Sequence, residues 1–481
     1  MTRKPVSDPS QPAAAETNPY RLLPPIDECL RAPELAPWGD RIGRSILRDF
    51  AQQVLERWRT AIRSDGLDAT TLQARIDAGD LTSEIAQAAQ REAGRGVVRA
   101  INATGVVLNT GLGRSPVHPE VADSMRIAAA SYCVLEVDRF SGKRNQRDEQ
   151  LSVLCNRLVG SEAAIAVNNN AAAAFLMMHT FARDKEAIVS RGEQVEIGGS
   201  FRVPDILSSA GAHMVEVGTT NRTRIRDYEK AITDRTGLLI KIHRSNFRLV
   251  GFQEEVEIAE MAELGRARDV TVAFDLGSGL IEYEGARPMT MLEGETRVRD
   301  AVECGTDAVS FSGDKLFGGP QAGVIVGRRD AIEELRANAL YRALRLDKTI
   351  LVGLEETMKR MLTGRGDSIP ARAMMHTTAE ELRIVAQRLA ARIEPGSGWT
   401  ATVEDSQSEP GSGSAPGVYL ASSVVRLRHE SISLDVLANR LRAGDPPVFA
   451  RVQEGALWID PRTLLEGDEG DLIAALHSIT H

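Results

Sequence analysis

The chain has 481 residues, of which 42 % are hydrophobic and 26 % charged, and its formal net charge is −9. This composition is typical of a globular protein with roughly two or three domains, and the acidic balance argues against a general nucleic-acid coat protein. No apolar run is long enough for a membrane span, and the 4 cysteines show neither a pairing motif nor metal spacing, so we expect a cytoplasmic protein with reduced thiols and no membrane partner.

The N-terminal region divides into a leader and a helical domain. Residues 1–19 lack the apolar segment of a secretory signal, and their Pro, Ser and Ala content predicts disorder. Residues 20–97 predict a helical domain, with one helix from Asp40 to Ile62 and another from Leu81 to Ala93. The first helix carries a basic stripe that could follow an RNA phosphate backbone, although a solvated helix face with interleaved acids is equally compatible. The stripe consists of Arg41, Arg44 and Arg48.

The middle of the chain predicts an α/β domain over residues 98–366, because short apolar runs alternate with helix-length segments. This alternation is typical of a mostly parallel sheet covered by helices. A long helix from Leu340 to Leu362 should lead out of this domain. The expected strands are Ala163–Val167, Glu186–Ser190, His213–Val217, Leu238–Ile242, Thr271–Asp275, Ala308–Ser310 and Ala322–Val326.

The remaining residues, 367–481, predict a smaller α+β domain. It should begin with a helix over Thr378–Ile393. The segment Glu404–Gly417 is rich in Ser, Pro and Gly, which predicts an exposed loop.

Three asparagines follow the first expected strand. Asn168, Asn169 and Asn170 stand between Val167 and an alanine-rich helix start. Backbone N–H groups at a helix N-terminus, aided by short amide side chains, suit a phosphate group. Simple helix capping explains this segment equally well when it is considered alone.

An acid and a lysine follow two later strands. Asp275 ends its strand, where a carboxylate would keep a pyridine nitrogen protonated, although a lone Asp before glycines more often caps a turn. Lys315 is bracketed by small residues, which suits an imine-forming amine better than a surface lysine. The order of asparagines, acid and lysine is that of fold-type I enzymes of pyridoxal 5′-phosphate (PLP). We therefore expect Lys315 to hold PLP as a Schiff base.

Longer motifs around these residues resemble one family. The resemblance runs from about residue 20 to the C-terminus and includes the glycine-rich segment Gly411–Ser414. The segments that carry the resemblance are Ile101–Gly105, Val167–Ala173, Val189–Glu193, Glu196–Arg202, Glu216–Thr223 and Ser310–Gly323. The family that they resemble is bacterial selenocysteine synthase, the L-seryl-tRNA(Sec) selenium transferase.

The resemblance implies an aspartate aminotransferase-like, fold-type I PLP transferase. A helical tRNA-binding domain would precede the PLP-binding domain in the sequence, and a small α+β domain would follow it. It also implies a homodecamer that serves selenocysteine biosynthesis. The implied reaction converts L-seryl-tRNA(Sec) to L-selenocysteinyl-tRNA(Sec) with selenophosphate. Water would be lost by PLP-dependent β-elimination, and selenium would add to an aminoacrylyl-tRNA intermediate.

The resemblance also implies roles for individual residues. Lys315 would be the Schiff-base lysine and Asp275 the partner of the pyridine nitrogen. For the reaction itself we expect Lys315, once freed, to be the general base and Asp314 to orient a proton or a donor group. The residues implied at the cofactor phosphate are Asn168, Asn169, Asn170 and Ser312. No metal ligands are implied.

Three arginines match basic positions that would receive the selenium-donor anion: Arg114, Arg342 and Arg345. A helix would place Arg342 and Arg345 on one face, and guanidinium groups bind oxyanions with forked hydrogen bonds. A solvated helix face paired with nearby acids is the alternative. The sequence departs from the family at Gly111, where Asn is usual before Leu-Gly-Arg.

Two competing hypotheses belong to other classes of protein. A small-molecule PLP lyase would share the core but not the tRNA substrate, and it gives no reason for the N-terminal helical domain. A catalytically silent tRNA-binding protein would not need Lys315 together with Asp275 and the asparagines.

Overall fold

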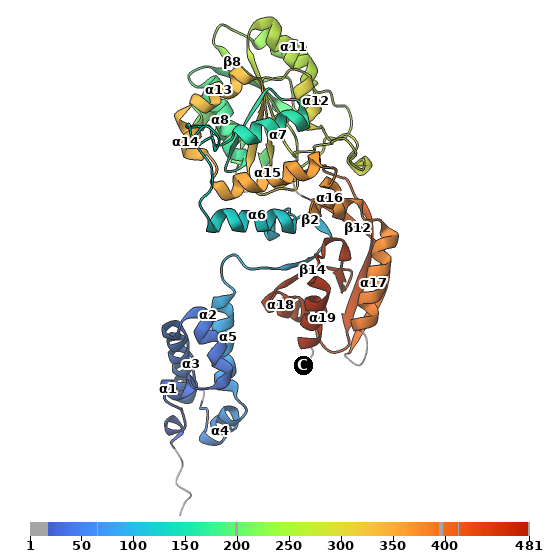
Figure 1. Ribbon diagram of the computed structural model, residues 1–481. Coiled ribbons are helices and arrows are strands. Elements are labelled where there is room, and N and C mark those ends of the chain that lie inside the picture. The colour runs from blue at the N-terminus through green and yellow to red at the C-terminus, as the bar shows by residue number, and fades with distance from the viewer. Residues whose placement is uncertain (1–17, 65, 198–200, 394–397, 412, 480–481) are drawn as a thin grey trace, which may run out of the picture. The chain divides into compact units, whose positions relative to one another are not determined.

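The computed structural model describes residues 18–479 apart from residues 65, 198–200, 394–397 and 412 (Figure 1). The chain divides into two compact units. One is Met1–Ala100 with Arg442–Pro447, and the other is Ile101–Leu441 with Val448–His481. Most of the predicted leader lies outside the described residues. None of the described helices has the length and hydropathy that a bilayer span requires.

The first unit is helical throughout its described part. The apolar positions of its longest helix recur at helical spacing, and Leu47, Val54, Leu55 and Trp58 are buried in one cluster with Leu35. The helices are α1 (Ile26–Cys29), α2 (Ala36–Ile42), α3 (Arg44–Ser64), α4 (Ala69–Asp77) and α5 (Asp80–Ala93).

The first predicted helix is in fact two helices. Gly43 separates α2 from α3 with a φ of 88°, a left-handed conformation that glycine adopts without strain. Arg41 therefore lies in the last turn of α2 whereas Arg44 begins α3, so the prediction of one helical stripe is wrong. Arg41, Arg44 and Arg48 are nevertheless all exposed, and Arg48 forms an ion pair with Asp27 of α1 at 2.5 Å.

A seven-stranded sheet in the order β3-β11-β10-β9-β8-β4-β7 forms the centre of the second unit. All neighbouring pairs are parallel except the two that β11 makes. The predicted strands and the mostly parallel α/β sheet are confirmed, with small differences at strand ends. The strands are β3 (Ala163–Val167), β4 (Glu186–Ser190), β7 (His213–Val217), β8 (Thr236–Ile242), β9 (Thr271–Gly277), β10 (Ala308–Ser312) and β11 (Gly323–Gly327).

Helices cover both faces of this sheet (Figure 1). Successive strand residues point to opposite faces, so Ile165 and Val167 lie in one core while Ala164 and Ala166 lie in the other. Burial on both faces explains why the strands are continuously apolar. The helices are α6 (Pro119–Ala130), α7 (Glu149–Val159), α8 (Asn170–Ala182), α9 (Val203–Ser209), α10 (Ile225–Ala231), α11 (Ile258–Arg268), α12 (Val298–Glu303) and α13 (Arg329–Ala337). A short hairpin, β5 (Glu196–Ile197) with β6 (Phe201–Arg202), precedes α9.

The predicted long helix leading out of the sheet is also two helices, α14 (Ala339–Leu344) and α15 (Lys348–Leu362). Arg345 has an extended backbone, with ψ of 148°, and forms a bridge to Val167 at the end of β3. Asp347 then begins α15 by accepting hydrogen bonds from two backbone N–H groups of its first turn. The prediction that a helix presents Arg342 and Arg345 on one face is therefore wrong.

The second unit also contains a six-stranded sheet in the order β1-β14-β15-β13-β12-β2. Two strands from the start of the unit join it, because β1 pairs in parallel with β14 and β2 with β12. The strands are β1 (Ile101–Ala103), β2 (Val106–Leu108), β12 (Trp399–Gly411), β13 (Leu420–His429), β14 (Val448–Gln453) and β15 (Ala456–Ile459). The accompanying helices are α16 (Pro370–His376), α17 (Ala379–Ile393), α18 (Leu434–Ala443) and α19 (Asp468–Ser478).

The segment Glu404–Gly417 is not the exposed loop that its composition predicts. Its first half continues β12 up to Gly411, and Ser408 is buried with its hydroxyl donating to Asp460. Its second half also turns inward, since Gly413 and Ser414 are buried. The small polar residues that favoured a loop instead allow close packing here.

Candidate active site

The chemistry-bearing residues gather at one edge of the seven-stranded sheet. Asn168 follows β3, His243 follows β8, Asp275 lies near the end of β9, and Lys315 follows β10. These four strands run in the same direction, so their carboxyl ends meet at a single edge. This is where an open α/β sheet binds its ligand.

Asp275 is a buried acid with fixed hydrogen-bond donors. Only 5 % of its surface is exposed, and its Oδ1 accepts hydrogen bonds from Asn170 Nδ2 at 2.7 Å and Ser310 Oγ at 3.0 Å. Burial raises the pKa of Asp275, while the two hydrogen bonds and nearby Lys315 and His243 act in the opposite direction. The carboxylate is thus held in place to meet a cationic partner.

Lys315 is a buried amine. Burial lowers the pKa of Lys315 below its usual value, because the charged form loses hydration. Asp275 opposes this effect, and the Arg114 guanidinium adds to it. A lysine with a lowered pKa carries a free amine more often, which is what imine formation requires.

The backbone of Gly413 lies close to the amine of Lys315. Its φ is 80°, and a Cβ atom added there would lie 2.6 Å from Lys315 Nζ. A side chain at this position would displace the lysine, so glycine is required both for the backbone conformation and for the close approach.

The asparagines do different things. Asn169 caps α8, since its side chain accepts the N–H of Ala172 at 2.9 Å, whereas Asn170 donates to Asp275. Asn168 is exposed, and its backbone N–H donates to Leu344. Ser312, at the end of β10, is buried on the same sheet edge.

Arg114 and Asp314 form an ion pair beside the lysine. Arg114 Nη1 lies 2.8 Å from Asp314 Oδ2, and the Asp314 side chain is only 8 % exposed. Arg114 has a φ of 61°, and the next residue donates its N–H to the Asp314 carbonyl. The Arg114 Nε is buried and has no hydrogen-bond partner. The structure therefore brings these two predicted residues together.

Of the other two predicted anion-binding arginines, only Arg345 has a backbone contact next to the asparagines. Arg342 is exposed on α14, and Arg345 is beside Val167. The side chain of Arg345 forms an ion pair with Glu136 at 3.4 Å. Within the described part of the chain, neither side chain forms a hydrogen bond or an ion pair with Lys315.

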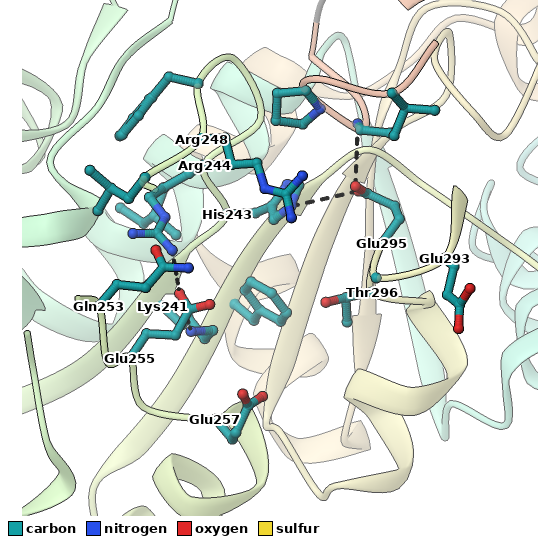
Figure 2. A pocket seen from close by; sticks show the side chains of 18 residues that line it. Lys241, His243, Arg244, Arg248, Gln253, Glu255, Glu257, Glu293, Glu295 and Thr296 are labelled. Carbon is teal, nitrogen blue, oxygen red and sulfur yellow. Dashed lines mark hydrogen bonds and ion pairs between the residues drawn. The ribbon is translucent and has the colours of Figure 1, made fainter. Parts of the chain in front are cut away.

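Sequence reasoning missed two polar residues next to the site, His243 and Glu295. Their side chains face each other, with His243 Nε2 at 3.7 Å from Glu295 Oε1, as Figure 2 shows. Both line a polar cavity of about 300 Å³. A histidine directly after a parallel strand is a signal that could have been used. Glu295 lies in an irregular segment and belongs to no recognisable motif.

A second cavity, of about 650 Å³, lies next to the first and shares Ala415, Pro416 and Val418 with it. Gly111 lines this second cavity and is exposed. A Cβ at Gly111 would meet no atom closer than 3.5 Å, so the backbone does not require glycine there.

Comparisons with known proteins identify the same family over most of the chain. The family model described as L-seryl-tRNA selenium transferase matches residues 100–465, and the one described as selenocysteine synthase N terminal matches residues 20–59. L-seryl-tRNA(Sec) selenium transferase from Moorella thermoacetica is 43 % identical over 95 % of this chain and 96 % of its own length. The protein of the same name from Nitratidesulfovibrio vulgaris is 40 % identical over 95 % of this chain and 98 % of its own.

A solved structure shares the fold. D-glucosaminate-6-phosphate ammonia-lyase aligns with a TM-score of 0.55 at 22 % identity, over 80 % of this chain and 96 % of its own. Together with the two sheets and the N-terminal helices described above, this likeness confirms the predicted fold class, an aminotransferase-like α/β fold with a helical N-terminus.

Proposed function

The chain belongs to the L-seryl-tRNA selenium transferase family, and from this premise and the residues around Lys315 we infer that it converts seryl-tRNA(Sec) to selenocysteinyl-tRNA(Sec) with the help of PLP. The observation that carries this proposal is the family match over residues 100–465, which contains the lysine, the buried acid and the ion pair beside them.

The residues at the sheet edge fit PLP. Lys315 supplies a buried amine, and Asp275 supplies a buried carboxylate. Two further polar atoms at this edge are buried without a hydrogen-bond partner, Asn170 Oδ1 and Ser278 Oγ. Unpartnered buried polar atoms are costly, so a bound polar group that satisfies them is expected. When bound, PLP serves as an electron sink that makes the α-proton of the seryl group acidic.

Lys315 and Asp275 have separate tasks in this proposal. Lys315 would hold the cofactor through its amine, and the same amine would serve as the base for the α-proton of the seryl group. Asp275 would pair with the pyridine nitrogen of the cofactor and keep it protonated. Its hydrogen bonds from Asn170 and Ser310 hold the carboxylate in one orientation.

The start of α8 is the proposed phosphate-binding element. Asn168, Asn169 and Asn170 lead into the first turn of α8, and the positive end of this helix of 13 residues lies at the sheet edge. Ser312 is the proposed additional donor. The capping role of Asn169 is compatible with this assignment, because capping holds the first turn of α8 rigid.

Arg114 is the proposed binder of the selenium-donor anion, selenophosphate. Its guanidinium is beside Lys315, and its buried Nε is free to donate to an oxyanion. Asp314 orients Arg114 through their ion pair and is the proposed group that handles the proton of the departing hydroxyl. Arg342 and Arg345 are proposed to complete the anion site.

The helical unit is proposed to bind tRNA. The N-terminal family model covers residues 20–59, which include the exposed Arg41, Arg44 and Arg48. Exposed arginines suit a phosphate backbone. We also propose that the protein is cytoplasmic and a homodecamer, as the family resemblance implies.

Incubation of the purified chain with seryl-tRNA(Sec), PLP and selenophosphate tests the proposal. The expected product is selenocysteinyl-tRNA(Sec). Failure with intact tRNA and bound PLP would overturn the selenium-transfer function but leave the cofactor assignment standing. Turnover of a small hydroxy amino acid in place of the tRNA would instead support a small-molecule lyase.

A further inference from the structure

Glu295 lies between two segments that border the lysine site. Its side chain is only 3 % exposed. One carboxylate oxygen, Oε2, accepts the backbone N–H of Ala415 at 3.3 Å, and the other, Oε1, faces His243 Nε2 at 3.7 Å. Oε1 has no hydrogen-bond partner, and neither has His243 Nδ1. Figure 2 shows Glu295 pointing into the first cavity between these two contacts.

The segment that Glu295 holds is strained. Ala415 has a φ of 40°, in the left-handed region that a residue with a side chain adopts at a cost of about 1–2 kcal/mol. Such a conformation persists only where surrounding contacts impose it. Ala415 is buried in a cluster with Leu316, the residue after the lysine, and its N–H is fixed by Glu295. The hydrogen bond from Ala415 to Glu295 therefore helps to keep Ala415 in a left-handed conformation that is unfavourable without such contacts.

The same segment forms a wall. Gly413 packs against Lys315 Nζ, and the residues from Ala415 to Val418 line the cavities of about 300 Å³ and about 650 Å³. We call Gly413–Val418 the partition, because both cavities contain Ala415, Pro416 and Val418. Movement of the partition would enlarge the space around Nζ and remove Gly413 from it.

We propose that Glu295 is a positioning residue that fixes the partition through the hydrogen bond that it accepts from Ala415. The fixed partition keeps Gly413 against Lys315 and so holds the lysine amine in place. The other carboxylate oxygen of Glu295 faces His243 and holds that side chain at the cavity. Its action on the lysine is indirect and geometric. The proposal about the partition is independent of the reaction, whereas its effect on turnover rests on the proposed function.

Three substitutions separate this positioning role from a purely electrostatic one. Glu295→Ala removes the acceptor, and Glu295→Asp keeps the charge but withdraws the carboxylate from Ala415 by one methylene. Glu295→Gln removes the charge but keeps an oxygen at the acceptor position. Glu293→Gln is the matched control, because Glu293 is exposed, two residues away, and subject to the same charge change.

Hydrogen–deuterium exchange of peptides that cover the partition, measured on the full-length protein, is the direct readout. Glu295→Ala and Glu295→Asp should accelerate exchange there, while Glu295→Gln and Glu293→Gln should leave it close to wild type. Exchange in β9 should be unchanged in all four. Wild-type exchange in Glu295→Asp, or faster exchange in Glu295→Gln equal to that in Glu295→Ala, would overturn the proposal. If Glu295→Ala does not fold, the contrast between Asp and Gln decides alone.

Turnover supplies the second readout. Misplacement of a reactive group by about 1 Å costs on the order of 100-fold in rate, so Glu295→Asp should lower kcat at least about tenfold and Glu295→Gln should restore most of it. Absence of selenium transfer by the wild-type chain would refute the proposed function but leave the exchange result to judge the partition. Normal exchange with lowered kcat in Glu295→Asp would refute the partition role alone.

Discussion

Gly413 and Lys315 are fitted to each other, since a Cβ atom at position 413 would lie 2.6 Å from Lys315 Nζ. The two residues come from different sheets, Gly413 from the turn after β12 and Lys315 from the turn after β10. The reactive amine therefore depends on a residue that lies almost 100 positions further along the chain.

Gly413→Ala should displace the lysine and lower activity at least about tenfold, because a misplaced reactive group loses rate steeply. Gly417→Ala is the matched control. Its φ of 78° gives the same backbone strain, but an added Cβ there meets nothing within 4 Å. Steady-state turnover and the absorbance of the lysine-bound cofactor provide the measurement. Equal losses in both variants would mean that backbone strain, not the contact with Lys315, is responsible.

Lys315→Ala should abolish the visible absorbance of bound PLP and reduce selenium transfer to background, because the variant has no amine to attach the cofactor. Lys230→Ala, which removes an exposed lysine on α10, should retain both. Spectra of the two purified variants after incubation with PLP make the comparison. An undiminished band in Lys315→Ala would exclude this lysine as the attachment point.

The stability of the cofactor-free protein should depend on pH through Asp275. Burial raises the pKa of Asp275, so the folded protein holds this proton more tightly than the unfolded chain does. Tighter proton binding by Asp275 in the folded state stabilises the protein. This stabilisation is fully present below the ordinary carboxyl pKa of about 3.9 and is lost as the pH rises through the raised pKa of Asp275. Asp275→Asn does not titrate and can still accept from Asn170 and Ser310. Its Tm should therefore exceed that of wild type increasingly across this window. A Tm difference that does not vary with pH would contradict the assignment.

Arg114→Gln should raise the KM for selenophosphate by about 10- to 100-fold, the effect of losing a charge-assisted hydrogen bond of about 1.5–3 kcal/mol. The KM for seryl-tRNA should change little. Arg126→Gln, at an exposed position on α6, is the control for the loss of one positive charge. An unchanged KM for selenophosphate with an altered KM for tRNA would place Arg114 on the tRNA side of the site.

Deletion of residues 1–95 should abolish tRNA binding and leave the absorbance of bound PLP intact, because the second compact unit begins at Ile101. Binding of tRNA by the full chain should also weaken with added salt if arginines contact phosphates. Filter binding at two salt concentrations, with the deletion variant beside the full chain, measures both effects. Unaltered tRNA affinity after the deletion would refute the assignment of the helical unit.

Strand positions were predictable from the sequence, because strands buried on both faces are continuous apolar runs. Ala163–Val167 and Glu186–Ser190 agree with the structure to the residue. Helix interruptions were not predictable from apolar spacing alone. Gly43 and the cap at Asp347 break two helices whose apolar periodicity continues across the gap. The glycine and the capping aspartate are single residues, and an apolar pattern that is averaged over many residues does not reveal them.

The candidate site was predictable where a motif follows a strand, as for Asp275 and Lys315. It was not predictable where a contact joins distant segments. The bond from Ala415 to Glu295 spans 120 positions, and the small polar residues around it are equally typical of an exposed loop. The composition of a segment shows which conformations it can adopt, but it does not show which distant residues will pack against it.

The pairing of β2 with β12 has a consequence for synthesis of the protein on the ribosome. All strands of the seven-stranded sheet lie between residues 163 and 327, so that sheet is complete while the last third of the chain is still being made. The six-stranded sheet needs Val106 beside Glu409 and Ile101 beside Val448, and it cannot form until those late residues emerge. Gly413 belongs to the same late segment. From the time Lys315 is synthesised until Gly413 and the C-terminal strands have emerged, the nascent chain therefore lacks the segment that encloses this lysine.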